Sequence, residues 1–221
     1  MASAANCINL EGGAKRKASS PKARVPARKR RRRGRHQGMV NFSGPIHKIL
    51  KEVQAGKRIT KGAVQTLNAM LNNLLVRMRN HITSLRDKRA TATDSDVQAA
   101  AKLVMDEGLA MHATFAVKQG MRAAAFHEKG KRYLWSGNFK AIVEQDGARL
   151  HSKYYCLAFQ AVMNYIAKVV LESAGEAARE RKVKTIATRD IAEAIHDDVE
   201  LLDLFRGTVP HAPANTADDL P

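Results

Sequence analysis

Cysteine and proline are scarce in this sequence of 221 residues, and each scarcity excludes a class of structure. The two cysteines, Cys7 and Cys156, lie far apart, which excludes a disulfide framework and the paired spacing of a zinc site. We expect Cys156 to be a small core residue. The six prolines lie at positions 21, 26, 45, 210, 213 and 221, so residues 46–209 contain none. This stretch is rich in Ala, Leu, Lys, Arg and Glu and therefore predicts an all-α fold.

Features of membrane proteins and of enzymes are also missing. No apolar run is long enough to cross a membrane, and the first residues lack the apolar stretch of a secretory signal. The eight histidines are scattered, and no glycine-rich loop that could hold a phosphate occurs. We therefore expect neither membrane contact nor catalysis, and no metal ion or cofactor.

Negative charge is missing from residues 15–35, which contain 12 Lys and Arg residues and no Asp or Glu. This run supplies much of the net charge of +17 and predicts contact with a polyanion, most commonly DNA or RNA. A nuclear-localisation signal is the alternative, and the two interpretations are compatible. The candidate DNA-binding residues in this run are Lys15, Arg16, Lys17, Arg28, Lys29, Arg30, Arg31, Arg32, Arg33 and Arg35.

Both ends of the sequence are poor in large apolar side chains. Residues 1–41 cannot bury enough apolar surface to offset the entropy of ordering, so we expect a disordered basic tail. Residues 207–221 contain Pro210, Pro213, Asp218 and Asp219, and we expect a short disordered end there as well.

One helical pattern occurs twice between these ends: a short helix, a basic loop, a long helix, a second loop and a short helix. The first long helix, predicted after Thr60 as its cap, carries apolar residues from Val64 to Leu85 at steps of three or four. The second long helix carries a similar stripe from Phe159 to Val170. Each long helix has more apolar surface than its short neighbours can cover. We therefore expect the two copies to pack their long helices against each other.

Several helix boundaries can be predicted from capping residues. The first short helix is expected at about 45–54, with Ser43 or Gly44 as its cap. Gly108 is expected to separate a further helix, at about 109–126, that only the first copy has.

The second loop of each copy indicates a duplicated unit. Thr91 and Thr185, which are 94 positions apart, each lie six residues before an apolar residue of the following helix. Thr93 and Asp96 resemble a capping box at the start of that helix in the first copy.

Several runs within this pattern resemble core histones. Residues 42–125 resemble histone 2B through Lys48-Ile49-Leu50-Lys51-Glu52-Val53 and Leu109-Ala110-Met111-His112-Ala113. Residues 136–206 resemble histone 2A, most clearly through Leu171-Glu172-Ser173-Ala174-Gly175-Glu176-Ala177-Ala178-Arg179. A chain that fuses the two in this order resembles the histone doublets encoded by giant DNA viruses of the marseillevirus kind.

The resemblance implies a fold, a function and partners. It implies two histone folds in tandem, at 42–125 and 136–206, joined by a linker at 126–135 and forming an intramolecular handshake pseudo-dimer. Such a protein wraps double-stranded DNA in a nucleosome-like particle, largely without regard to base sequence. The implied partners are a histone 3/histone 4-like doublet or tetramer and a second copy of this chain within an octamer. A viral factory, the virion or the host nucleus is the implied location.

The same resemblance assigns DNA contacts to the loops between helices. Arg89 and Thr91 match an arginine and a threonine of the histone 2B loop, whereas Arg149 lies near the matching arginine of histone 2A. Lys184-Thr185 replaces a threonine–arginine pair, which puts insertion into the minor groove in doubt there. An isolated Lys or Arg is more often an ordinary solvated charge, but placement at four predicted loops favours DNA contact. The loop candidates are Lys57, Arg58, Thr60, Lys88, Arg89, Thr91, Arg149, Lys153, Lys182, Lys184, Thr185 and Arg189.

Three carboxylates match part of the acidic patch of histone 2A, a docking surface for other chromatin proteins. These are Glu172, Asp198 and Glu200, and they could instead only solubilise a face. Asn164, Val169 and Val199 occupy positions where the family has acids, so we expect weak or altered docking.

Other functions remain open from the sequence. A non-nucleosomal DNA compactor with a histone fold would share the basic loops and the paired helices. A sequence-specific transcription-factor pair would need side chains that reach base edges, and nothing in the sequence marks them.

Overall fold

The computed structural model of the chain describes residues 39–86, 90–125, 138–145, 148 and 150–208. The described residues are mostly helical, as predicted, with four strands of two residues each. The elements in chain order are α1 (Ser43–Val53), β1 (Arg58–Ile59), α2 (Lys61–Arg86), β2 (Thr91–Ala92), α3 (Asp94–Val104), α4 (Glu107–Ala125), α5 (Asn138–Val143), β3 (Leu150–His151), α6 (Tyr155–Glu180), β4 (Thr185–Ile186), α7 (Thr188–Asp197) and α8 (Val199–Leu204). No helix among these residues is long and apolar enough to cross a membrane.

The same order of elements occurs in two halves, the first from α1 to α4 and the second from α5 to α8. Each half has a short helix, a strand, a long helix, a second strand and a second short helix. The long helices α2 and α6 contain 26 residues each. Only the first half continues into a further long helix, α4, and only the second ends in the short helix α8.

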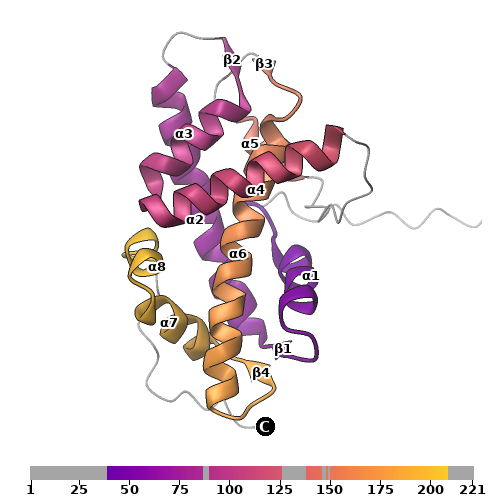
Figure 1. The fold of residues 1–221 in the computed structure, drawn as a ribbon, viewed down its shortest axis with the longest axis vertical. Coiled ribbons are helices and arrows are strands. Elements are labelled where there is room, and N and C mark those ends of the chain that lie inside the picture. The colour runs from indigo at the N-terminus through magenta and orange to yellow at the C-terminus, as the bar shows by residue number, and fades with distance from the viewer. Residues whose placement is uncertain (1–38, 87–89, 126–137, 146–147, 149, 209–221) are drawn as a thin grey trace, which may run out of the picture. The chain divides into compact units, whose positions relative to one another are not determined.

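The apolar stripes predicted on the long helices are buried, except that Leu85 at the end of the first stripe is exposed. Leu67, Leu71 and Met78 of α2 are fully buried, and so are Phe159 and Ile166 of α6. In Figure 1, α6 passes in front of α2, with α1 on one side of the pair and α7 and α8 on the other. Burying an aliphatic or aromatic side chain stabilises a fold by about 1.5–3 kcal/mol, so this shared core is a major source of stability. Neither half could cover its long helix alone.

The short strands join the two halves to each other. β1 pairs in parallel with β4, and β2 pairs in parallel with β3. Each pair therefore takes one strand from each half. Figure 1 shows the two pairs at opposite ends of the long helices. The chain thus brings a loop of the first half beside a loop of the second at both ends.

Two predicted boundaries were wrong in detail. α1 begins at Ser43 with Phe42 as its cap, rather than at about 45, because the carbonyl of Phe42 already accepts a bond from the amide of Ile46. Gly108 does not separate α3 from α4, since it lies in the first turn of α4. The break falls at Met105, whose extended backbone ends α3.

Two predictions about burial also need correction. Val40, placed by the sequence in a disordered tail, is almost fully buried, because its backbone amide and carbonyl both bond to the side chain of Asn72. The packed unit therefore begins before residue 42. Cys156 is only half-buried and lies at the edge of the core, with its Sγ 3.8 Å from Oε1 of Glu144. The linker at 126–135 lies outside the described residues.

Candidate nucleic-acid interface

The β1·β4 edge consists of residues 57–61 and 182–189. Two backbone bonds hold it together: the amide of Arg58 donates to the carbonyl of Lys184 at 2.9 Å, and that of Thr60 to Ile186 at 2.9 Å. This register places Arg58 opposite Thr185. Five of the candidate DNA-binding residues are exposed on this edge, namely Arg58, Lys182, Lys184, Thr185 and Arg189.

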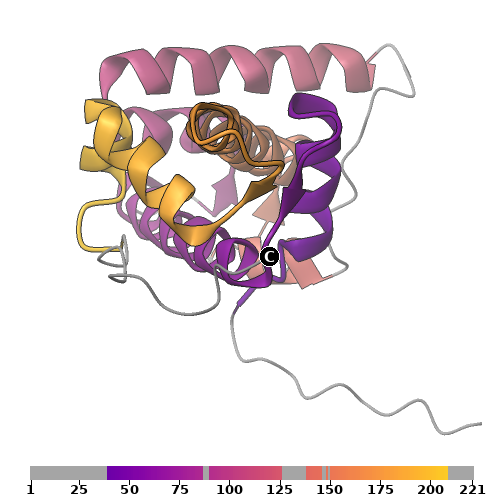
Figure 2. The ribbon, with the colours of Figure 1, turned by 90° about the horizontal axis from the view of Figure 1, so that it is seen from below.

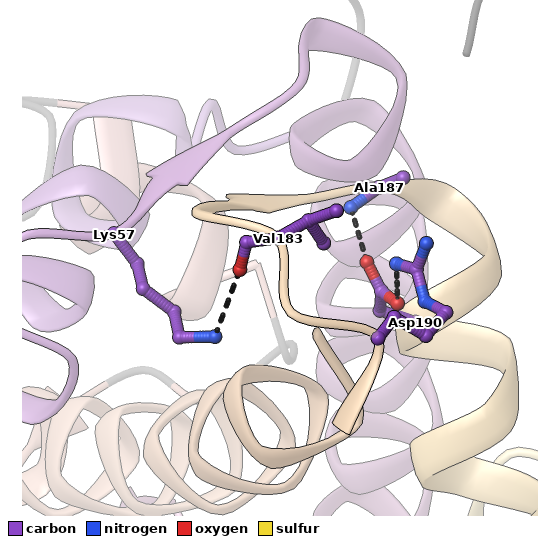
Figure 3. A network of polar contacts seen from close by, with 5 residues as sticks. Lys57, Val183, Ala187 and Asp190 are labelled. Atoms are coloured by element: carbon purple, nitrogen blue, oxygen red, sulfur yellow. Dashed lines mark hydrogen bonds and ion pairs between the residues drawn. The ribbon is translucent and has the colours of Figure 1, made fainter. Parts of the chain in front are cut away.

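Lys57 is the least exposed cation of the β1·β4 edge. Its ammonium group donates to the carbonyl of Val183 at 3.5 Å (Figure 3). Partial desolvation lowers the pKa of Lys57, the nearby cations Arg179 and Arg181 lower it further, and Asp190 opposes them. A bound anion would stabilise the charged form of Lys57, because it would offset the repulsion from Arg179 and Arg181.

An ion pair fixes the loop that carries Lys182 and Lys184. The carboxylate of Asp190 is fully buried, pairs with Arg181 and accepts a bond of 2.6 Å from the amide of Ala187 (Figure 3). Lys182, between these residues, has a positive φ of 60° and ends α6 in a left-handed turn. The ion pair therefore holds the loop lysines in one arrangement.

Two helices begin at the β1·β4 edge, α2 at Lys61 and α7 at Thr188. A Cβ added to Gly62 would lie 3.0 Å from the Thr188 hydroxyl, which shows how closely the helix starts approach. The Thr60 hydroxyl accepts a bond of 3.2 Å from the amide of Ala63 and thereby caps α2, as predicted. Helix starts carry partial positive charge, so the edge combines them with lysine and arginine side chains.

The β2·β3 edge consists of residues 90–94 and 150–155. The amide of Leu150 donates to Ala90 at 3.2 Å, and the amide of Ser152 donates to Ala92 at 2.8 Å. Lys153 is exposed, with its ammonium 5.4 Å from the centre of the Tyr154 ring. Thr91 is also exposed on this edge. Lys88, Arg89 and Arg149 were predicted here but lie outside the described residues, as do the candidates of residues 15–35.

The capping box predicted at the β2·β3 edge is present. The carboxylate of Asp96 accepts bonds from the amide and the hydroxyl of Thr93 at 2.8 and 2.9 Å. Asp94 accepts a bond of 3.4 Å from the hydroxyl of Ser152, which links the two halves. The first turn of α3 thus contains two carboxylates at this edge.

Two residues of these edges were not predicted. Lys61 is exposed at the first turn of α2, directly after the basic loop, and its position in that run could have revealed it. His151 lies in β3 with its ring 4.9 Å from that of Tyr155, and its place between Arg149 and Lys153 in the predicted loop could have revealed it.

The three acidic candidates gather around Tyr165 of α6. Desolvation raises the pKa of the Tyr165 phenol, and Glu200, Asp198 and Glu172 raise it further. Asp198 caps α8 by accepting bonds from the amides of Glu200 and Leu201 at 2.9 and 3.1 Å. The structure therefore brings the three residues together. One carboxylate oxygen of Asp198 is already bonded to the amides at the start of α8.

Comparison with known proteins identifies the family. The family model described as the core histone H2A/H2B/H3/H4 domain matches residues 22–103. The chain is 31% identical over 87 residues to the histone H2B subacrosomal variant of Bos taurus, an alignment that covers 38% of this chain and 71% of that protein.

A solved structure shows the same fold. The crystal structure of the histone from Methanopyrus kandleri superimposes with a TM-score of 0.50 and 18% identity, covering 69% of this chain and 91% of that one. Neither half alone makes up 69% of this chain, so the likeness extends over both halves. Core histones are structural proteins that bind DNA and associate as dimers and multimers. The chain belongs to the core histone family.

Proposed function

We propose that this chain is a histone doublet that packages double-stranded DNA. Its two halves would form one handshake pair within a single polypeptide, a histone 2B-like half followed by a histone 2A-like half. The supporting observation is the pairing of loops between halves at the β1·β4 and β2·β3 edges. The β1·β4 edge combines several exposed cations with the starts of two helices, and the described part of the β2·β3 edge combines Lys153 with the starts of two others. Such an arrangement suits phosphate rather than base edges.

DNA contact would be made by both edges and by the basic tail. Lys57, Arg58 and Lys184 would neutralise phosphates at the β1·β4 edge, and Thr91 and Lys153 would contribute at the other. Arg89 and Arg149 would enter the minor groove where it faces the protein. Because phosphate contacts carry no sequence information, binding would be largely independent of base sequence.

The complete particle would need partners. The proposed assembly joins this chain to a histone 3/histone 4-like doublet or tetramer, with two copies of this chain in one nucleosome-like octamer. Glu172, Asp198 and Glu200 would form a reduced acidic patch that docks other factors weakly. The location would be DNA in a viral factory, a virion or a host nucleus.

Nuclease protection tests this assignment. The full chain is reconstituted with a histone 3/histone 4-like partner on long DNA and digested with a non-specific nuclease. We expect a discrete protected length that depends on both proteins. An open-ended ladder would instead support the second candidate, a histone-fold DNA compactor, and protection of one base sequence alone would support a transcription-factor pair. Unprotected DNA would contradict all three.

A further inference from the structure

Helix α4 has a buried side and an outer side with unusual chemistry. Its buried residues Leu109, Ala113 and Val117 recur every three or four positions and face the core with α6. In Figure 2, α4 runs along one side of the described unit, and no other described helix or strand covers its outer side. This outer side is therefore accessible surface.

Two large apolar side chains lie one helical turn apart on this outer side. Met111 is 61% exposed and Phe115 is 57% exposed. Both line a hollow of about 550 Å³, together with Lys102, Ala110 and Thr114. Phe115 also lines a second hollow of about 440 Å³ on the side of α1 and α6. Phe115 therefore projects between two hollows. The same side chain of a second copy could enter one of these hollows.

Charges of opposite sign flank this apolar pair. Glu107 lies one turn before Met111, whereas Lys118 lies about one turn after Phe115, and both are exposed. In an antiparallel pair of α4 helices related by a twofold axis at residue 113, Met111 faces Phe115 and Glu107 faces the region of Lys118. The dimer then contains two charge pairs of opposite sign, one at each end of an apolar centre, and each copy contributes one Glu107 and one Lys118. A parallel pair would place like charges together.

We propose that the outer face of α4 docks the same face of a second copy of this chain, with the two α4 helices antiparallel. Phe115 of each copy enters the hollow beside Met111 of the other. Glu107 and Lys118 select this direction, because only the antiparallel arrangement brings them together. The contact requires neither DNA nor other histones and is additional to any placement of two copies within one particle.

The size of the contact predicts a weak association. Each copy offers two large apolar side chains, well below the roughly 800 Å² per partner that a stable complex buries. The pair therefore forms where copies are concentrated, as they are when many lie close together on packaged DNA. A twofold contact of this kind closes on itself and adds no further copies through the same face.

Sedimentation equilibrium of the full chain, without DNA and at about 0.15 M salt, tests the proposal. The wild type should shift from monomer towards dimer as its concentration rises. Phe115→Ser should raise the dissociation constant at least about tenfold, because the central apolar side chain is removed. Val199→Ser, at a residue that is 71% exposed on α8, is the matched control and should leave the constant unchanged.

A charge exchange distinguishes self-pairing from any other occupant of this face. Glu107→Lys alone and Lys118→Glu alone should each weaken dimerisation about threefold or more, since each creates two like-charge pairs in the dimer. The double variant E107K/K118E should restore it, because the charges are again opposite across the twofold axis. Helical circular dichroism identical to that of the wild type shows that each variant is folded.

Two results would overturn the proposal. One is a wild type that stays monomeric up to its solubility limit. The other is a double variant that associates as weakly as the single variants, which would mean that α4 meets a different surface. Neither result depends on whether the chain wraps DNA.

Discussion

The β1·β4 and β2·β3 edges are built on the same backbone plan, but they hold their loops by different chemistry. At the β2·β3 edge, Asp96 bonds to the hydroxyl and amide of Thr93. Asp190 is the matching residue 94 positions later, and Ala187 replaces the threonine. Arg181 supplies the missing partner by pairing with Asp190. Asp96 thus bonds to a threonine hydroxyl, whereas Asp190 pairs with an arginine and also accepts a bond from the amide of Ala187.

The difference also changes the charge that each edge presents. The carboxylate of Asp190 is buried and neutralised by Arg181, so the β1·β4 edge exposes mainly cations. At the β2·β3 edge, the half-buried Asp94 lies in the first turn of α3, and Lys153 is the one exposed Lys or Arg among the described residues of that edge. We therefore expect the described part of the β1·β4 edge to hold phosphate more strongly than that of the β2·β3 edge.

Removing the matched carboxylates should give the largest effect and the clearest contrast. Asp190→Ala should lower the free energy of unfolding by about 3 kcal/mol, because it leaves Arg181 without its buried partner. Asp96→Ala removes the bonds to Thr93 and should lower it by at least about 1 kcal/mol, the usual cost of a lost helix cap. Urea unfolding of both variants beside the wild type measures this, and a loss below about 1 kcal/mol for Asp190→Ala would contradict the role of its ion pair.

A contact between the halves beside the β1·β4 edge should give the next effect. The side chain of Gln54 donates to the carbonyl of Glu172 at 3.2 Å and covers Gly175, where an added Cβ would lie 2.4 Å from it. Gly175→Ala should therefore destabilise the fold by about 1–2 kcal/mol, because it displaces this buried amide. Thermal or urea unfolding provides the measurement.

Two further variants control the Gly175 experiment. Gly120→Ala in α4 should be neutral or stabilising, because its Cβ would have ordinary contact with Ala161 at 3.7 Å and alanine favours a helix. Combining Gln54→Ser with Gly175→Ala should cost less than the sum of the two single changes, since the shorter side chain removes the clash. Strict additivity would show that Gln54 is not the obstacle.

The salt dependence of DNA binding should separate the two edges. Removing one cation that neutralises a phosphate should reduce the slope of log affinity against log salt by about 0.9 on duplex DNA. We expect Lys57→Gln with Lys184→Gln to reduce the slope by about twice that amount, and Lys153→Gln by at most about that amount. Lys168→Gln, on the groove beside α1 and α4, is the control and should leave the slope unchanged.

The smallest expected effect concerns pH and Lys57. Because desolvation and the neighbouring arginines lower its pKa, Lys57 loses its charge at a lower pH than an ordinary lysine. Lys57→Arg keeps its charge throughout this range. The ratio of wild-type to variant affinity for duplex DNA should therefore be constant near neutral pH and fall as pH rises towards the ordinary lysine range. A ratio that stays flat would show that Lys57 does not contact phosphate.

Much of the fold was predictable because helical periodicity is a local property. The spacing of Leu67, Leu71 and Met78 indicated the buried side of α2, and the absence of proline indicated the mostly helical class. The matching positions of Thr91 and Thr185 indicated the repeated second loop, and both lie in the short strands that pair the halves. Capping by Thr60 and by Thr93 followed from the same local rules.

The parts that escaped prediction depend on contacts between distant residues. Val40 is ordered by Asn72, 32 positions later, and Gln54 covers Gly175 from another helix. Arg181 pairs with Asp190 across a loop that contains Lys182 with a positive φ. The two residues are not on one helix, so helical spacing could not predict the pair.

The order of neighbouring residues determined the helices and their buried sides, and the composition determined the excess of cations. These features could therefore be predicted from the sequence alone. Which loops meet depends on how α2 and α6 pack, and this packing joins Arg58 to Thr185, 127 positions later, and Thr91 to Leu150, 59 positions later. The three-dimensional fold also settles which carboxylates are neutralised and which apolar side chains of α4 stay exposed. Charge and exposure are properties of the folded surroundings rather than of a residue type.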